Sequence, residues 1–390
     1  MTGSALNLFG RSSAIHEALF LERPNRFVVR VDLHGKIVDA HCPNPGRLLE
    51  ILVPGNPLLL EERATQPERR GKRSPRLPYA LVAARHRGVL VPLRSAQAND
   101  LAEKIVLPRL FPNLGKIQRE VTLDKSRLDF LLNFDEKELF LEVKGCTLIE
   151  EQTAMFPDAP TLRGLKHLGE LEALAGRGRP AGVLFILMSP EVRRFVPNLH
   201  TDPAFARKLI SLKDKIWMWA VSIRTRESGS AEVANLDVPI ELKAASAALK
   251  DSGAYILVLR LKQRCRITPG SLGEISLDSG WYTYVGSGMG NLSSRIARHH
   301  RLRKTLHWHI DYLLDRVGSR EIISLPVRSL HRLECPLARD LAELAAGVTL
   351  RFGCSDCSCP SHLFRFDSNP LQDRRFLDLL FHYRHTVALA

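Results

Sequence analysis

Arg127-Leu-Asp-Phe-Leu-Leu-Asn133 and Glu138-Leu-Phe-Leu-Glu-Val-Lys144 are the two stretches that decide the fold in the middle of this chain. Both are rich in residues typical of strands, and the segment between them favours a tight turn centred on Asp135 and Glu136. Residues equally distant from the turn of an antiparallel hairpin face each other. The sequence therefore predicts a two-stranded hairpin whose apolar residues, such as Leu141, form a buried face.

The predicted hairpin places Asp129 opposite Glu142, and Lys144 on the same face as Glu142. Two carboxylates about 5 Å apart repel each other unless a cation lies between them. Hard oxygen ligands suit Mg²⁺ or Mn²⁺, and a nearby ammonium group can offset charge on a phosphate. Glu120 is a candidate third carboxylate. The alternative is a structural hairpin in which Asp129 pairs with Arg127 or Lys144.

Composition narrows the classes of protein that the chain can belong to. It has 390 residues, enough for two or three domains, and a net charge of +14 that favours polyanionic partners. Its apolar runs are shorter than the roughly 20 residues of a membrane span, so we expect no membrane association. The first residues lack a secretory signal, and the 7 cysteines do not suggest a disulfide framework. These observations predict a cytoplasmic protein; a homodimer remains open.

The chain changes character along its length. Short strands and turns favour a small β-barrel over residues 1–95, with a basic loop, Arg69–Arg73, that either contacts DNA or is solvated surface. Helices alternate with strands over 96–242, which is typical of an α/β domain. Residues 243–252 are a predicted linker, 253–367 a small α+β domain, and 368–390 a tail with an amphipathic helix. The fold class is therefore α/β and α+β multidomain.

The hairpin resembles the PD-(D/E)xK nuclease motif, and the surrounding sequence resembles the sugar fermentation stimulation protein A family over about residues 15–242. This resemblance implies an OB-like barrel, a PD-(D/E)xK-like domain and DNA binding. It implies catalytic roles for Asp129, Glu142 and Lys144, with the two carboxylates holding the metal. It also implies that Arg163 and Lys166 face DNA phosphates. The matching stretches include His41–Gly46, Arg76–Tyr79, Ser126–Phe130, Glu142–Lys144, Ala154–Thr161, Arg163–His167 and Phe195–Asn198.

A second constellation begins at Gly253-Ala-Tyr255. The strand Gly280–Gly286 and a glycine-rich turn follow, and a predicted basic helix then carries Arg295 together with Arg298 and Arg301, of which the last two are candidate phosphate contacts. Taken alone, the glycines are also explained by tight turning.

The second constellation resembles the GIY-YIG nuclease superfamily over nearly all of 253–366. The resemblance implies that Tyr255 and Tyr284 orient or deprotonate the attacking water and that Arg295 stabilises charge at phosphorus. It also implies that a glutamate holds Mg²⁺, for which Glu334 is the candidate.

A cysteine cluster lies near the end of the second constellation. Cys354, Cys357, Cys359 and His362 have a spacing compatible with tetrahedral zinc, although Cys357 and Cys359 are only two residues apart. Free thiols, or a metal site shared with His307 or His309, are the alternatives.

The sequence thus predicts a DNA-binding protein, a Mg²⁺- or Mn²⁺-dependent endonuclease with two nuclease-like modules. The alternatives are a non-catalytic DNA-binding regulator of sugar metabolism genes and an RNA-processing factor, since OB-like barrels accept single strands of either nucleic acid.

Overall fold

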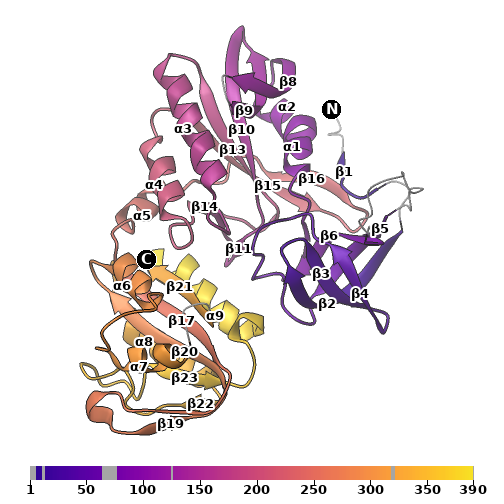
Figure 1. Ribbon diagram of the computed structural model, residues 1–390. Coiled ribbons are helices and arrows are strands. Elements are labelled where there is room, and N and C mark those ends of the chain that lie inside the picture. The colour runs from indigo at the N-terminus through magenta and orange to yellow at the C-terminus, as the bar shows by residue number, and fades with distance from the viewer. Residues whose placement is uncertain (1–5, 11–13, 64–76, 124–125, 318–320, 390) are drawn as a thin grey trace, which may run out of the picture. The chain divides into compact units, whose positions relative to one another are not determined.

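The computed structural model describes residues 6–10, 14–63, 77–123, 126–317 and 321–389 (Figure 1). The chain forms two compact units, Met1–Asn198 with Ala204–Leu242, and Leu199–Pro203 with Lys243–Ala390. The first unit thus ends at Leu242. The segment predicted as a linker is partly helical, because α5 spans Leu242–Ala247. The basic loop Arg69–Arg73 lies outside the described residues.

The first part of the chain is a closed β-barrel. Its strands have the order β4-β3-β2-β5-β6-β7, and β4 also pairs with β6, which closes the sheet. The predicted hairpin is present: β3 and β4 are joined by His34 and Gly35, whose φ angles of 52° and 83° form a two-residue turn. The strands are β2 (Ile15–Asn25), β3 (Val28–Leu33), β4 (Lys36–His41), β5 (Pro57–Glu62), β6 (Tyr79–His86) and β7 (Val89–Pro92).

A seven-stranded mixed sheet follows, in the order β1-β16-β15-β13-β10-β9-β8, with β10, β13 and β15 parallel. Helices α3 and α4 pack on one face, around Phe140, Phe185 and Phe205. The other face packs against α1 and the barrel. The elements are β1 (Leu6–Asn7), α1 (Gln97–Leu101), α2 (Leu107–Leu110), β8 (Leu114–Leu123), β9 (Ser126–Phe134), β10 (Lys137–Cys146), α3 (Leu162–Gly176), β13 (Ala181–Leu187), α4 (Pro203–Ser211), β15 (Trp217–Thr225) and β16 (Ser230–Asn235).

A smaller three-stranded sheet carries the segment that precedes α3. It consists of β11 (Ile149–Glu150), β12 (Thr153–Phe156) and β14 (Arg194–Pro197). Asp158, in the segment after β12, contacts the barrel loop at Gly46. A Cβ added to Gly46 would lie 2.2 Å from Asp158 Oδ2. Burial raises the pKa of the Asp158 carboxyl, whereas the backbone N–H groups of Leu48 and Arg47 lower it. Only glycine allows this close approach of the barrel loop to the segment that leads into α3.

The second unit is built on an antiparallel five-stranded sheet, in the order β21-β17-β20-β23-β22. The predicted helix in the tail is present: Phe376, Leu377 and Leu380 of α9 are buried, so residues 374–385 belong to this unit. The elements are β17 (Gly253–Leu261), β18 (Cys265–Ile267), β19 (Ile275–Leu277), β20 (Gly280–Gly288), α6 (Leu292–His299), α7 (His309–Val317), β21 (Ile322–Arg328), α8 (Glu334–Leu344), β22 (Gly347–Val348), β23 (Leu363–Phe366) and α9 (Arg374–His385).

No helix among the described residues is long and apolar enough to span a membrane.

Candidate active sites

The hairpin of β9 and β10 has the predicted register. Phe140 pairs with Leu131 and Leu141 with Phe130, which brings Asp129 and Glu142 to the next position along the ladder. The turn residues Asp135 and Glu136 have φ angles of 44° and 60°, as a two-residue hairpin turn requires. Both faces of β10 are buried, because α3 covers one and the barrel side of the core covers the other.

Asp129 is held in place by two hydrogen bonds. Val143 N donates to Oδ2 over 2.8 Å, and Asn99 Nδ2, from α1, donates to Oδ1 over 2.8 Å. Burial raises the pKa of the Asp129 carboxyl, and the negative charge of Glu142 raises it further. The two donors orient the carboxylate but do not remove its repulsion from Glu142.

Glu142 is almost entirely buried, with 1% of its surface exposed. Its Oε1 contacts both Lys144 Nζ and His167 Nδ1. Its Oε2 is buried and has no hydrogen-bond partner among the described residues. Burial opposes ionisation of Glu142, but His167 and Lys144 outweigh it and hold the pKa of the carboxyl below its usual range. The site therefore contains an ionised carboxylate with one oxygen left for another ligand.

His167 is a site residue that the sequence analysis did not single out. Thr161 caps α3 by accepting from Gly164 N over 2.9 Å, and the buried face of this helix carries His167 to Glu142. His167 ends the stretch Arg163–His167, which matches the family, and that match was the only signal for it. The predicted phosphate contacts Arg163 and Lys166 are exposed on the same helix.

Glu120, the candidate third carboxylate, does not join this group in the described contacts. Its side chain is 65% exposed and lies 3.4 Å from Arg127.

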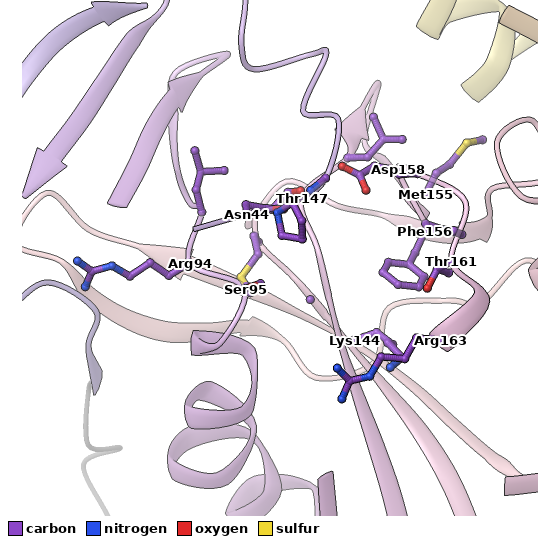
Figure 2. Close-up of a pocket in the computed structure, with 18 of the residues that line it drawn as sticks. Asn44, Arg94, Ser95, Lys144, Thr147, Met155, Phe156, Asp158, Thr161 and Arg163 are labelled. Atoms are coloured by element: carbon purple, nitrogen blue, oxygen red, sulfur yellow. Dashed lines mark hydrogen bonds between the residues drawn. The ribbon is translucent and has the colours of Figure 1, made fainter. Parts of the chain in front are cut away.

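A cavity of about 530 Å³ opens beside Lys144 (Figure 2). Lys144 lines it from β10, and Arg163 lines it from the first turn of α3. Arg26, in the barrel, and Arg94, in the segment after β7, line it as well. The remaining walls come from the barrel loop around Asn44 and from residues 155–161. Four basic side chains and Asp158 therefore line the cavity, and it adjoins the carboxylate pair through Val143 and Lys144.

The second candidate site lies in the C-terminal unit, on β17 and β20. Tyr255 is paired in register with Gly286, and a Cβ on Gly286 would lie 2.4 Å from the Tyr255 hydroxyl. That hydroxyl is 2.7 Å from His299 Nε2, on α6. Tyr284, on β20, has its ring 6.4 Å from the His299 ring. The two predicted tyrosines thus lie at one site. Gly286 has no Cβ and therefore leaves room there for the Tyr255 hydroxyl.

The ionisable groups of this second site are buried. Burial raises the pKa of Tyr255, although Arg295 opposes the shift, and burial also raises that of Tyr284. Burial lowers the pKa of His299 to about 4, and Lys304 contributes. His299 is therefore a neutral imidazole at neutral pH. Its spacing of four residues from Arg295 was the only sequence signal that placed it on this helix face.

Arg295 and Glu334 meet at Ser287. Arg295 Nη1 donates to the Ser287 carbonyl oxygen over 2.9 Å, and the Ser287 hydroxyl donates to Glu334, the first residue of α8. Burial opposes ionisation of Glu334, but His362 and Ser287 outweigh it and lower its pKa. The structure therefore brings Glu334 to the site that contains the predicted arginine and tyrosines.

The two predicted phosphate contacts on α6 and after it differ in their surroundings. Arg298 forms two hydrogen bonds, of 2.8 and 2.9 Å, with the fully buried Asp311. Arg301 is exposed. The guanidinium of Arg298 is thus already paired inside the unit, which leaves Arg301 as the exposed candidate.

The cysteines and histidine that cluster in the structure differ at one position from the predicted set of zinc ligands. The ligand atoms of Cys335, Cys357, Cys359 and His362 all lie within 4.8 Å of one another, and Cys354 is not part of this group. Helix α8 supplies Cys335, which is distant in sequence, so the local spacing of residues 354–362 does not reveal the group that the fold brings together.

The fold and the two sites define a class: a multidomain protein with an OB barrel, an α/β domain carrying an Asp…Glu-x-Lys hairpin, and a GIY-YIG-like domain. Three family models match this order. They are the SfsA N-terminal OB domain over residues 21–93, the sugar fermentation stimulation protein RE domain over 96–229, and the domain of unknown function DUF123 over 254–383. DUF123 has a GIY-YIG-like fold.

Relatives of known name agree with these family models. A sugar fermentation stimulation protein homolog of Desulfitobacterium hafniense is 39% identical over 196 residues, which cover 50% of this chain and 83% of the relative. One of Clostridium perfringens is 38% identical over 221 residues, 55% of this chain and 93% of the relative. The structure of Pyrococcus furiosus SfsA in complex with Ca²⁺ aligns with a TM-score of 0.53 and 30% identity, over 60% of this chain and 99% of that chain. The chain belongs to the sugar fermentation stimulation protein family and carries an additional DUF123 domain.

Proposed function

We propose that this protein binds DNA and hydrolyses its phosphodiester bonds with the help of a divalent metal ion at Asp129 and Glu142. The observation that carries the proposal is the buried Oε2 of Glu142, which has no hydrogen-bond partner among the described residues and which belongs to a carboxylate held ionised beside a second one. A buried carboxylate oxygen without a partner is costly, and a hard cation would remove that cost.

The residues present fit Mg²⁺ or Mn²⁺, since Asp129 and Glu142 offer hard oxygen ligands. A relative has been solved in complex with Ca²⁺, another cation that prefers oxygen. When bound, the metal would activate a water nucleophile and offset charge on the phosphate. Asn99 and the Val143 amide orient the first carboxylate, and His167 orients the second.

Basic side chains around the cavity supply the proposed DNA contacts. Lys144 would stabilise negative charge that develops on the phosphate, since its ammonium lies beside Glu142. Arg163 lines the same cavity at the start of α3, and Lys166 is exposed on that helix, 3.4 Å from Glu170. The overall charge of +14 favours the approach of DNA.

The C-terminal unit is proposed as a second nuclease module. Neutral His299 would accept a hydrogen bond from the Tyr255 hydroxyl, which leaves a lone pair of that oxygen to accept one from the attacking water, and Arg295 would stabilise charge at phosphorus. Glu334 is the carboxylate that would hold a metal ion there.

The test is single-turnover cleavage of labelled DNA by Glu142→Gln, with Glu138→Gln as the matched control. Glu138 lies on the same strand, is 51% exposed and sits 3.4 Å from Arg179, so its loss removes a carboxylate without touching the site. We expect the first variant to lose the cleavage due to this module and the control to keep it.

Binding measurements separate the enzyme from its alternatives. DNA binding that falls with salt but is unaffected by a chelator, without cleavage, would favour a non-catalytic regulator. Tighter binding to matched RNA than to DNA would favour an RNA-processing factor.

A further inference from the structure

Four soft metal ligands converge in the C-terminal unit from two separate segments. Cys335 is the second residue of α8, whereas Cys357, Cys359 and His362 lie in the segment between β22 and β23. Their ligand atoms are all within 4.8 Å of one another, and Cys357 Sγ lies 3.5 Å from His362 Nε2. Zinc–sulfur bonds of about 2.3 Å place the sulfurs of a tetrahedral site about 3.8 Å apart. The cluster is therefore close to the size that one zinc ion requires.

We propose that Cys335, Cys357, Cys359 and His362 bind one structural Zn²⁺ ion, with Cys335 in the place that local sequence spacing gives to Cys354. Three thiolates and one imidazole close a tetrahedral site, as structural zinc sites do. The ion would tie the first turn of α8 to the segment before β23.

The thiols of Cys335, Cys357 and Cys359 lie close enough together, with His362, to share a single ion. Crowded thiols of this kind ionise when a divalent cation supplies the opposite charge. Binding would transfer three thiol protons to the buffer and leave His362 neutral with its Nε2 on the metal.

The second ring nitrogen of His362 gives the site a direct connection to Glu334. His362 is almost fully buried, and its Nδ1 lies 3.4 Å from Glu334 Oε1. A metal-bound histidine commonly donates its other N–H to a carboxylate, which fixes the orientation of the ring. Zinc would therefore also position Glu334, and this second role alone rests on the proposed nuclease function.

The experiment compares the zinc content of Cys335→Ser with that of Cys354→Ser in the full chain. Each protein is purified under reducing conditions, incubated with Zn²⁺ and desalted, and its metal is measured by inductively coupled plasma mass spectrometry. We expect one zinc per chain in wild type and in Cys354→Ser, and a loss of at least tenfold in Cys335→Ser. Zinc retained by Cys335→Ser, or lost from Cys354→Ser alone, overturns the proposed ligand set.

The absorption spectrum of the cobalt-substituted wild type tests the same site without a variant, which matters if Cys335→Ser does not fold. We expect the thiolate-to-cobalt charge-transfer band and the intense d–d bands of tetrahedral coordination. Absence of these bands overturns the proposal. So does a disulfide between two of the cysteines, detected by mass spectrometry of the protein purified without reductant. Zinc bound without any DNA cleavage would remove only the proposed nuclease function, so the two failures are distinguishable.

Discussion

Binding of a divalent cation at Asp129 and Glu142 should stabilise the protein, and Asp129→Asn should abolish that effect. Cross-strand carboxylates about 5 Å apart repel each other by about 3 kcal/mol at an effective dielectric constant of about 20. A cation between them converts this repulsion into attraction. At a concentration 100-fold above its dissociation constant, a ligand stabilises the folded state by about 2.7 kcal/mol.

This stabilisation is large enough to measure by thermal unfolding. One kcal/mol shifts the Tm of a unit of this size by about 2–4 °C, so the cation should raise Tm by about 5–11 °C. Differential scanning calorimetry of the full chain, with Ca²⁺ or Mn²⁺ against EDTA, measures the rise in wild type and in Asp129→Asn. The matched control is Glu120→Gln, which removes an exposed carboxylate paired with Arg127. An equal rise in Asp129→Asn and wild type would refute the reasoning, as would loss of the rise in the control.

Three further predictions concern stability and DNA contact. Gly46→Ala places a methyl group 2.2 Å from a buried carboxylate oxygen and should cost about 1–3 kcal/mol in urea unfolding, whereas Gly169→Ala, with open space on α3, should stabilise by up to about 1 kcal/mol. The pKa of His299 is lowered to about 4, so the unfolded chain takes up this proton at about pH 6.5 and the folded chain does not. Stability should then be full above pH 6.5 and fall by about 3 kcal/mol as the pH drops to 4; if His299→Gln shows the same slope, the buried neutral imidazole is not its source. Arg298→Met should destabilise by about 1–3 kcal/mol because it removes the guanidinium paired with the buried Asp311 carboxylate, which keeps Lys304 and two backbone N–H groups as partners, whereas Arg301→Met should leave stability unchanged and weaken DNA binding measured by fluorescence anisotropy; the reverse pattern would contradict the assignment.

Local patterns in the sequence were sufficient to predict the hairpin that carries the first candidate site. The β9–β10 hairpin is specified by two strand-forming stretches and a two-residue turn, so its register places Asp129 and Glu142 without knowledge of the rest of the chain. Tyr255 and Tyr284 lie on the adjacent strands β17 and β20, which residues 262–279 separate, so the sequence indicated their shared site only through the resemblance.

Contacts between distant segments were beyond the reach of local patterns. Nothing near Glu142 indicates that His167, on α3, contacts it, because that contact depends on how the helix packs on the sheet. Cys335 replaces Cys354 in the cysteine cluster since the first turn of α8 meets the segment before β23. Arg298 was predicted from charge alone, and charge does not reveal that Asp311 is buried beside it.

Cleavage of DNA by the full chain tests the central claim most directly. Labelled duplex, single-stranded and branched DNA are incubated with Mg²⁺ or Mn²⁺ and wild type, Asp129→Asn/Glu142→Gln or Tyr255→Phe/Arg295→Ala. The account predicts metal-dependent cutting by wild type, and loss from each double variant of the cutting that its own module performs. Wild type that binds all three substrates and cuts none of them, with either metal, would contradict the account.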